Sequence, residues 1–183
     1  MQVAQMKMSG MWREVADAAR TTVGKEAGEG EPSSAWKRKI LLAEHSPIRL
    51  IKFSWEWRDL PSWVSVHFVR HKFGIEHFVS TQRTDRTGID RNNLPQGSLV
   101  RHRCEANAQA IINISRKRLC NMASPETRTA WKLVLEEIDK ICPELVSCCV
   151  PECAYRGFCP EMKGCMFYGS DNYIKTRSEH IAK

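Results

Sequence analysis

The chain has 183 residues, of which 42% are hydrophobic and 27% are charged, proportions that are ordinary for a globular protein. This length suffices for one domain with a hydrophobic core and is too short for two large domains. No apolar run approaches the roughly 20 residues that a membrane helix needs, and Met1–Gly10 lacks the apolar segment of a secretory signal. We therefore expect a cytoplasmic protein with no membrane partner.

The charge balance is basic, because 28 Lys and Arg residues outnumber 21 Asp and Glu residues and give a formal net charge of +7. A basic protein favours anionic partners. Nucleic acid and phosphorylated small molecules both satisfy this condition, and charge alone does not choose between them.

Patterns in the first third of the chain predict two helices and a strand. Trp12–Val23 consists of good helix formers, and Ser33 or Ser34 is suited to cap a second helix over Ala35–His45. Hydrophobic and polar residues then alternate over Ile48–Trp57. This period of two predicts a half-buried strand.

The middle of the chain predicts a helix that opens at Pro61, an extended segment over His77–Thr84 and a polar loop over Asp85–Ser98. Apolar residues at three- and four-residue spacing then predict a helix from Glu105 to Met122.

Ser124 and Pro125 are a strong helix start, with a cap followed by proline at the first helical position. This helix is expected to reach Ile141, and the polar tail Gly169–Lys183 is expected to be loosely held.

A first candidate cluster combines a basic triplet at the end of a predicted helix with a polar extended segment. Such a group suits the recognition of phosphates and ring carbonyls, since Arg offers a planar fork of donors and Lys a compact charge. The alternative is a solvated basic face. The cluster comprises Arg70, His71, Lys72, Ser80, Gln82 and Arg83.

A second candidate cluster is Asn107, Asn113 and Arg118, all on one predicted helix. At about 100° per residue, Asn107 and Arg118 fall on nearly the same side of the apolar stripe and Asn113 on its other flank. Polar groups in such positions can line a cleft at a subunit junction, or they can be ordinary residues at the edge of a core.

In these two clusters the sequence resembles the flavin-dependent thymidylate synthase (ThyX) family. The signature of that family is Arg-His-Arg, seven residues, then Ser, and here seven residues separate Lys72 from Ser80. The family also has Asn-Ala, an Asn six residues after the first and an Arg five further on. Asn107, Asn113 and Arg118 reproduce these intervals.

Two further segments carry the same resemblance. His45–Pro47 looks like the His-rich turn that leads into a strand in the family, and Ala123–Arg128 is similar to the family's next helix start. The resemblance covers about Ala16 to Ile141.

This resemblance implies an α+β fold of the thymidylate-synthase-complementing-protein type, a single domain in which a small antiparallel sheet packs with long helices. It implies a methyltransferase that converts dUMP to dTMP with FAD as cofactor and with NADPH and methylenetetrahydrofolate as co-substrates. It also implies a homotetramer with shared active sites, and it makes nucleic acid an unexpected partner.

The resemblance further implies roles for individual residues. Arg118 would be catalytic, because it would pair with the uracil edge of dUMP and stabilise negative charge on the ring. The dUMP phosphate would be bound by Ser80, Gln82 and Arg83. The flavin would be bound by Arg70, His71, Lys72, Asn107 and Asn113.

The sequence departs from the family at several points. Lys72 replaces an Arg, which keeps the charge and loses the bidentate fork. Arg83 follows Ser80 by three residues instead of two, so Thr81 is an alternative equivalent of Ser80. A second family His is replaced by Leu50.

The segment Asp85–Ala106 is shorter than the family insert, which carries another nucleotide-binding Arg. These departures keep open a diverged nucleotide- or nucleic-acid-binding protein on the same fold. The candidates to replace that Arg are Arg86, Arg91, Arg101 and Arg103.

Eight cysteines are many for a cytosolic chain, and clustered thiols in a reducing compartment indicate metal more than disulfide. Four of them form a candidate zinc or iron–sulfur site: Cys149, Cys153, Cys159 and Cys165. Cys148 is a possible substitute for Cys149. The alternative is that these cysteines are buried free thiols.

The expected organisation is a catalytic domain over residues 1–147, a Cys-rich segment over 148–168 packed on it, and the tail over 169–183.

Overall fold

The computed structural model describes residues 1–182. Its centre is a four-stranded sheet of order β1-β2-β4-β3, in which every neighbouring pair is antiparallel. The strands are β1 (Gln2–Ser9), β2 (Lys52–Pro61), β3 (Ile75–Val79) and β4 (Leu99–Asn107).

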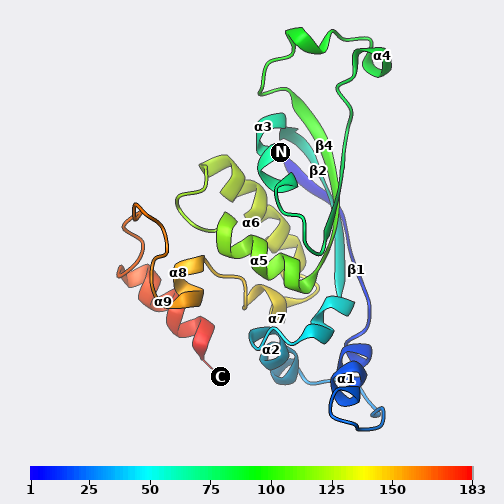
Figure 1. The fold of residues 1–183 in the computed structure, drawn as a ribbon, viewed down its shortest axis with the longest axis vertical. Helices are drawn as coiled ribbons and strands as arrows, with labels where there is room; N and C mark the ends of the chain where they lie inside the picture. Colours follow the sequence, from blue (N-terminus) through cyan, green and yellow to red (C-terminus); the bar gives the residue numbers. More distant parts are fainter. Residues whose placement is uncertain (183) are drawn as a thin grey trace.

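Helices account for most of the remaining described chain (Figure 1). The α-helices are α1 (Trp12–Thr21), α2 (Ser34–Leu42), α3 (Ser62–Val69), α4 (Thr84–Thr87), α5 (Ala108–Arg118), α6 (Pro125–Asp139), α7 (Pro143–Val146), α8 (Glu152–Arg156) and α9 (Asp171–Ile181). Two short 3-10 helices are η1 (Ser46–Leu50) and η2 (Arg91–Asn93). No described helix is long and apolar enough to cross a membrane.

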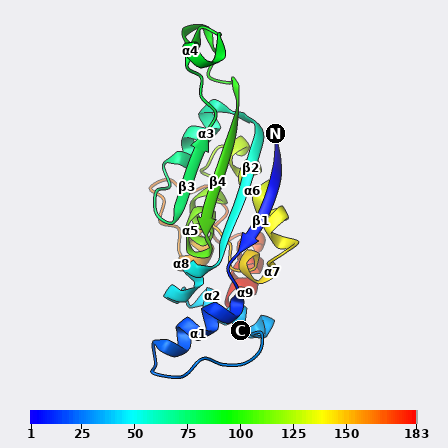
Figure 2. The same ribbon diagram turned by 90° about the vertical axis from the view of Figure 1, so that its right-hand side faces the viewer.

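The sheet carries helices on one face only. Figures 1 and 2 show α5 and α6 behind the same face of the sheet. Buried and exposed residues alternate along β4, as expected for a strand with one covered face. On the other face, Arg101 of β4 donates to both carboxylate oxygens of Glu56 in β2.

An aromatic cluster forms the core between the sheet and α6. Trp55, Trp57 and Trp131 are fully buried, and the ring of Phe68 stacks on Trp57 with centroids 4.4 Å apart. The indole of Trp131 donates to Ser115 Oγ at 2.9 Å. The polar atom of this large ring is therefore satisfied inside the core, as burial requires.

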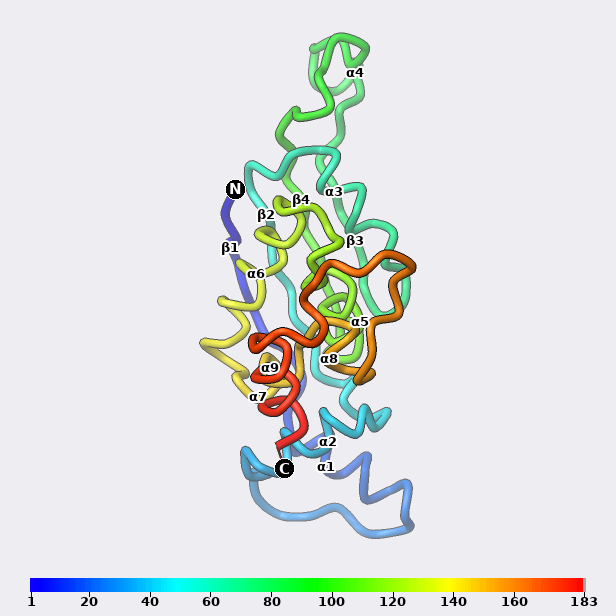
Figure 3. The backbone as a smooth tube through the Cα atoms, turned by 90° about the vertical axis from the view of Figure 1, so that its left-hand side faces the viewer, coloured from blue at the N-terminus to red at the C-terminus, as the bar shows by residue number. Residues whose placement is uncertain are grey.

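The segment between β3 and β4 projects beyond the sheet as an arm that contains α4 and η2 (Figure 1). The C-terminal part of the chain, from α8 to α9, runs along the side of the molecule where α5 lies (Figure 3). Arg38 of α2 anchors the end of α9 by donating to the carbonyls of Glu179 and His180 at 2.8 and 3.1 Å.

The predicted α+β class with a small antiparallel sheet is confirmed. The helix starts at Ser33 and Ser124 are confirmed too, since both side chains accept a backbone N–H of their helix. The helix predicted from Glu105 is wrong in its first part, because Leu99–Asn107 is β4 and the helix begins at Ala108.

Three other expectations are corrected. The strand predicted from Ile48 begins at Lys52, because the preceding residues form η1. Strand β1 was not predicted at all; it lies at the edge of the sheet, with a register shift between Ala4 and Lys7. The tail expected to be loosely held contains helix α9 (Asp171–Ile181), and Lys183 lies outside the described residues.

Candidate functional site

The candidate site is the place where the C-terminal ends of α3 and α5 meet. Arg118, the last residue of α5, donates from Nε to His71 Nε2 at 2.9 Å and from Nη2 to the carbonyl of His67 at 2.6 Å. His71 of the first predicted cluster and Arg118 of the second are therefore in direct contact.

Arg118 is half-buried, and both of its hydrogen-bond acceptors are uncharged. Among the described residues, no carboxylate forms an ion pair with Arg118, Arg70 or Lys72. Burial lowers the pKa of Arg118, and the charge of Arg70 lowers it further. A partly desolvated cation without a protein counter-ion is well placed to bind an anion or to stabilise developing negative charge.

A chain of hydrogen bonds continues from His71 into the protein. His77 Nε2 donates to the carbonyl of His71 at 2.9 Å, His77 Nδ1 lies 2.9 Å from His102 Nε2, and His102 Nδ1 lies 3.0 Å from Ser65 Oγ. Sequence patterns missed His102 and Ser65. The sequence offers no signal for Ser65. For His102 it offers only a period-two position shared with Val100 and Cys104.

Burial lowers the pKa of His71 to about 4, and the charges of Arg118 and His77 add to this effect. Burial likewise lowers the pKa of His102 to about 4, with a further contribution from His77. Both imidazoles are therefore neutral at pH 7. The lone pair on His71 Nε2 is available to accept from Arg118, and this bond fixes the direction of the guanidinium.

These shifts predict how stability depends on pH. Unfolded histidine takes up a proton near its ordinary pKa of 6.5, whereas His71 and His102 stay neutral in the folded protein down to about pH 4. Between these values the unfolded state binds more protons, so we expect the free energy of unfolding to fall as pH falls from about 6.5 to about 4. Denaturant unfolding at several pH values measures this slope.

Two substitutions check this assignment: His102→Gln is the test and His45→Gln is the control. Glutamine keeps hydrogen-bonding capacity and does not titrate. Replacement of the buried His102 should therefore reduce the slope of the unfolding free energy against pH. His45 is exposed, and its replacement should leave the slope as it is. Equal slopes in both variants would contradict the assignment.

The structure places the predicted flavin-binding residues in different settings. Arg70 and Lys72 are exposed in the turn after α3. Asn107 caps α5 by accepting the backbone N–H of Ala110 at 2.9 Å. Gly74 packs closely on the side-chain amide of Asn107. A Cβ atom at position 74 would lie 2.6 Å from Nδ2 of Asn107. Asn107 is therefore fixed in position.

Asn113 lies elsewhere on α5. It is exposed, and its side-chain oxygen accepts from Gln109 at 3.4 Å and from Arg116 at 3.1 Å. No hydrogen bond among the described residues joins it to His71 or Arg118.

The predicted phosphate-binding residues lie at the base of the arm. Ser80 Oγ accepts the backbone N–H of Arg101 at 3.0 Å, and Gln82 is half-buried. Arg83 forms a two-pronged ion pair with Asp85 at 2.9 and 2.7 Å. In the described part of the chain, no hydrogen bond connects these residues to Arg118.

The four arginines considered as substitutes for the family's insert also separate. Arg101 is paired with Glu56, and Arg103 donates to Gln5 at 2.9 Å. Arg86 and Arg91 are exposed on the arm.

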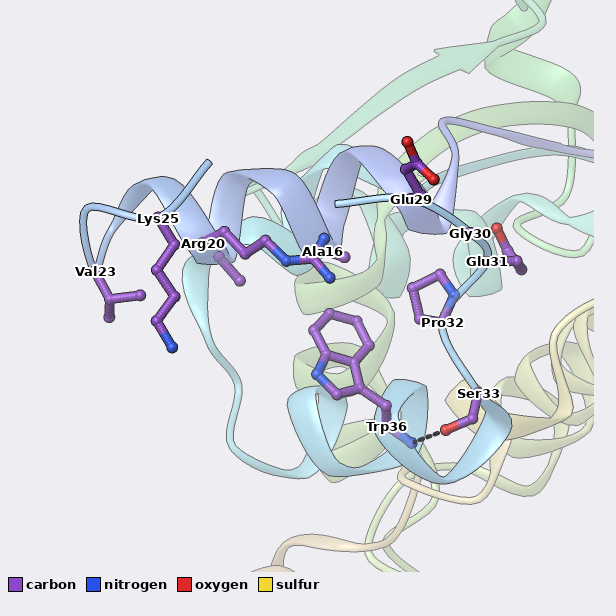
Figure 4. Close-up of a pocket in the computed structure, with 11 residues that line it drawn as sticks. Ala16, Arg20, Val23, Lys25, Glu29, Gly30, Glu31, Pro32, Ser33 and Trp36 are labelled. Carbon is purple, nitrogen blue, oxygen red and sulfur yellow. Dashed lines mark hydrogen bonds between the residues drawn. The ribbon is translucent and has the colours of Figure 1, made fainter. Parts of the chain in front are cut away.

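Neither of two cavities in the described chain is lined by Arg118 or His71. A cavity of about 170 Å³ lies beside Asn107 and Gly74, which is below the roughly 300 Å³ at which ligand pockets begin. A larger cavity of about 460 Å³ lies between α1 and α2, where Arg20, Lys25 and Trp36 line it (Figure 4). No predicted site residue lines this larger cavity.

The structure does not bring together the four cysteines of the predicted metal site. Cys153, Cys159 and Cys165 line one pocket, as predicted, and the fourth thiol there is Cys120 instead of Cys149. Cys149 is buried and donates to the carbonyl of Leu145.

Burial raises the pKa of Cys149 to about 12, and Cys148 and Cys142 are its thiol neighbours. Cys148 likewise donates to a carbonyl, that of Glu144. Cys149 and its predicted substitute Cys148 therefore match the alternative of buried free thiols.

His77, His102 and Cys104 bring their potential ligand atoms within 4.8 Å of one another. The 2.9 Å contact between the two imidazoles uses a nitrogen of each in a hydrogen bond, and burial raises the pKa of Cys104. The imidazoles of this group are therefore engaged in a hydrogen-bonded network.

The fold is that of the flavin-dependent thymidylate synthases. The chain superposes on ThyX from Helicobacter pylori complexed with FAD and dUMP with a TM-score of 0.67 and 12% identity, over 82% of this chain and 100% of that one. A second structure of that protein with FAD and dUMP gives a TM-score of 0.63 and 12% identity, over 80% and 99%.

A UMP/dUMP methylase, PolB from Streptomyces cacaoi bound with 5-Br dUMP, has the same fold. Its TM-score is 0.64 with 14% identity, over 86% of this chain and 95% of that one. No protein-family model and no curated protein matches the sequence. The shared architecture is thus established by structure.

Proposed function

We propose that the protein is a flavin-dependent nucleotide methylase, and specifically a thymidylate synthase that converts dUMP to dTMP with methylenetetrahydrofolate and NADPH. The observation that carries this proposal is Arg118, a half-buried cation held by two uncharged acceptors. Support also comes from the solved structures of this fold, which hold FAD and dUMP or a dUMP analogue.

Arg118 acts on the uracil ring of the nucleotide. Its Nη1 donates no hydrogen bond within the described chain, so it is free to donate to a ring carbonyl of the substrate. Negative charge gathers on that carbonyl as C5 becomes nucleophilic. The donor is already oriented by His71, and such preorganised donors stabilise the transition state more than the ground state.

Residues in and beside the turn after α3 suit the anionic parts of FAD. Arg70 and Lys72 present two exposed cations that form no ion pair with a described carboxylate. Asn107, at the opposite end of α5 from Arg118, is held rigidly against Gly74 in this turn. When bound and reduced by NADPH, the flavin would supply the hydride that completes the methyl group. The protein groups bind and orient it, and Lys72 does so as a point charge instead of a fork.

The site needs more than one chain. The cavity beside Asn107 is far too small for a whole dinucleotide. Within the described chain, no hydrogen bond joins Ser80 or Arg83 to Arg118. A homotetramer would unite these groups from different subunits. Light scattering should then give the mass of four chains of 21.0 kDa each.

Purification followed by binding and turnover assays tests this function. We expect a yellow protein that binds FAD and dUMP and forms dTMP when NADPH and methylenetetrahydrofolate are supplied. Lys72→Ala should weaken FAD binding by roughly 5- to 30-fold, since a lost charged hydrogen bond costs about 1–2 kcal/mol. Arg13→Ala, an exposed substitution on α1, is the matched control.

A colourless protein that ignores both FAD and dUMP would overturn the proposal. Binding of single-stranded nucleic acid by such a protein would instead support the alternative of a nucleic-acid-binding protein on the same fold, with the exposed Arg86 and Arg91 of the arm as contacts.

A further inference from the structure

Four thiols from separate parts of the chain converge beside the end of α5. Cys120 follows α5, Cys153 belongs to α8, and two more lie in the segment between α8 and α9. All four line one small pocket.

Ordinary core packing does not explain this convergence. The segment 157–170 contains no helix or strand, and three of its large apolar side chains point outward: Phe158 is 51% exposed, and Met162 and Met166 are almost fully exposed. Phe167 is half-buried. The cysteines of the segment instead face the pocket. No two of the four thiols are joined in a disulfide. A segment that turns most of its large apolar side chains to solvent and its thiols inward needs another source of cohesion.

We propose that this pocket binds an iron–sulfur cluster through four thiolate ligands, Cys120, Cys153, Cys159 and Cys165. Four thiolates are the usual ligand set of such clusters. A cluster bound by all four residues ties the segment 157–170 to α5 and α8.

The spacing of the sulfurs favours a cluster over a single zinc ion. Zinc binds four thiolates as a tetrahedron with bonds of about 2.3 Å, which places every pair of sulfurs about 3.8 Å apart. Among the described residues, no three of these four sulfurs lie within 4.8 Å of one another. A cluster holds its ligands farther apart, because several iron and sulfide ions lie between them.

The surroundings of the thiols also suit a cluster. Pro151, Pro160 and Phe167 line the pocket beside them, and such low-polarity walls limit the access of water. Pro160 directly follows Cys159, the Cys-Pro order that also occurs in bacterial ferredoxins.

The cluster would lie next to the candidate site. Cys120 is two residues beyond Arg118, so a ligand of the cluster fixes the end of the helix that carries the guanidinium. Another ligand, Cys153, belongs to α8, and α8 is joined to α9 by a hydrogen bond from Arg177 to the carbonyl of Tyr155. The cluster would therefore join α5 to the C-terminal helices.

Metal analysis of the full chain tests this proposal. After anaerobic purification or reconstitution with ferrous iron and sulfide, we expect about two or about four iron ions per chain with as many sulfides. Electron paramagnetic resonance of the reduced protein should show the cluster without interference from flavin. Cys120→Ser and Cys165→Ser should each lose most of the iron.

Cys149→Ser is the matched control and should keep the iron, because its thiol lies outside the pocket. Cys165 lies in the irregular segment, so its replacement tests ligation even if Cys120→Ser fails to fold. One zinc per chain in place of iron, no uptake of iron, or loss of iron in Cys149→Ser with retention in both other variants would overturn the proposal. None of these measurements involves FAD or dUMP, so they are independent of the proposed function.

Discussion

Replacing Arg118 with alanine is expected to lower kcat for dUMP methylation by roughly 10²- to 10³-fold, the usual effect of removing one preorganised donor to developing negative charge. The reason is the position of Arg118, which is half-buried, oriented by His71 and His67, and without a carboxylate partner. Steady-state kinetics with saturating FAD measures this effect.

A measurement of flavin binding shows whether Arg118→Ala has lost a catalytic group or has damaged the structure. Arg70 and Lys72 remain in Arg118→Ala, so the absorbance and affinity of bound FAD should change little. Arg118→Lys keeps the charge and loses the fork that reaches both His71 and the substrate. We expect it to recover only part of the activity. Full turnover in Arg118→Ala would remove this residue from the mechanism.

The convergence of His71 and Arg118 was predictable only in part. Spacing in the sequence identified both residues, and helical periodicity placed Arg118 on a helix. Neither signal contains the angle at which α3 and α5 meet, which depends on how both helices pack on the sheet. The contact itself therefore came from tertiary structure.

Strand β4 shows why a local pattern can mislead. The covered side of this strand includes His102 and Cys104, residues that do not read as apolar alternation. The helical period of the following residues is clear, and the helix it predicts starts at Glu105, inside the strand. The hydrogen bond of His102 to Ser65 makes its burial favourable, and Ser65 lies 37 residues earlier in the chain.

The fourth thiol was missed for a related reason. Cys149 lies close in sequence to Cys153, whereas Cys120 is separated from it by α6 and α7. Ligand sets are defined by distance in space, and spacing along the chain is informative only when the ligands share a local segment. Cys159 and Cys165 meet that condition, and they line the same pocket as Cys153.

Trp131→Ala is expected to cause a large loss of stability, about 3–5 kcal/mol of unfolding free energy. Trp131 is fully buried, and its ring packs against Trp55, Trp57 and Phe68. Its removal leaves a large cavity between α6 and the sheet. Since whole domains are stable by only about 5–15 kcal/mol, denaturant unfolding should show a much lower midpoint.

Trp131→Phe separates packing from hydrogen bonding. Phenylalanine keeps most of the ring and loses the N–H that reaches Ser115 Oγ. Ser115 still donates to the carbonyl of Ile111 at 2.8 Å, so it keeps a partner and the loss should be smaller than for alanine. Phe73 is 91% exposed, and Phe73→Ala should change stability by less than about 0.5 kcal/mol. Equal effects of Trp131→Ala and Phe73→Ala would show that the aromatic cluster does not hold α6 on the sheet.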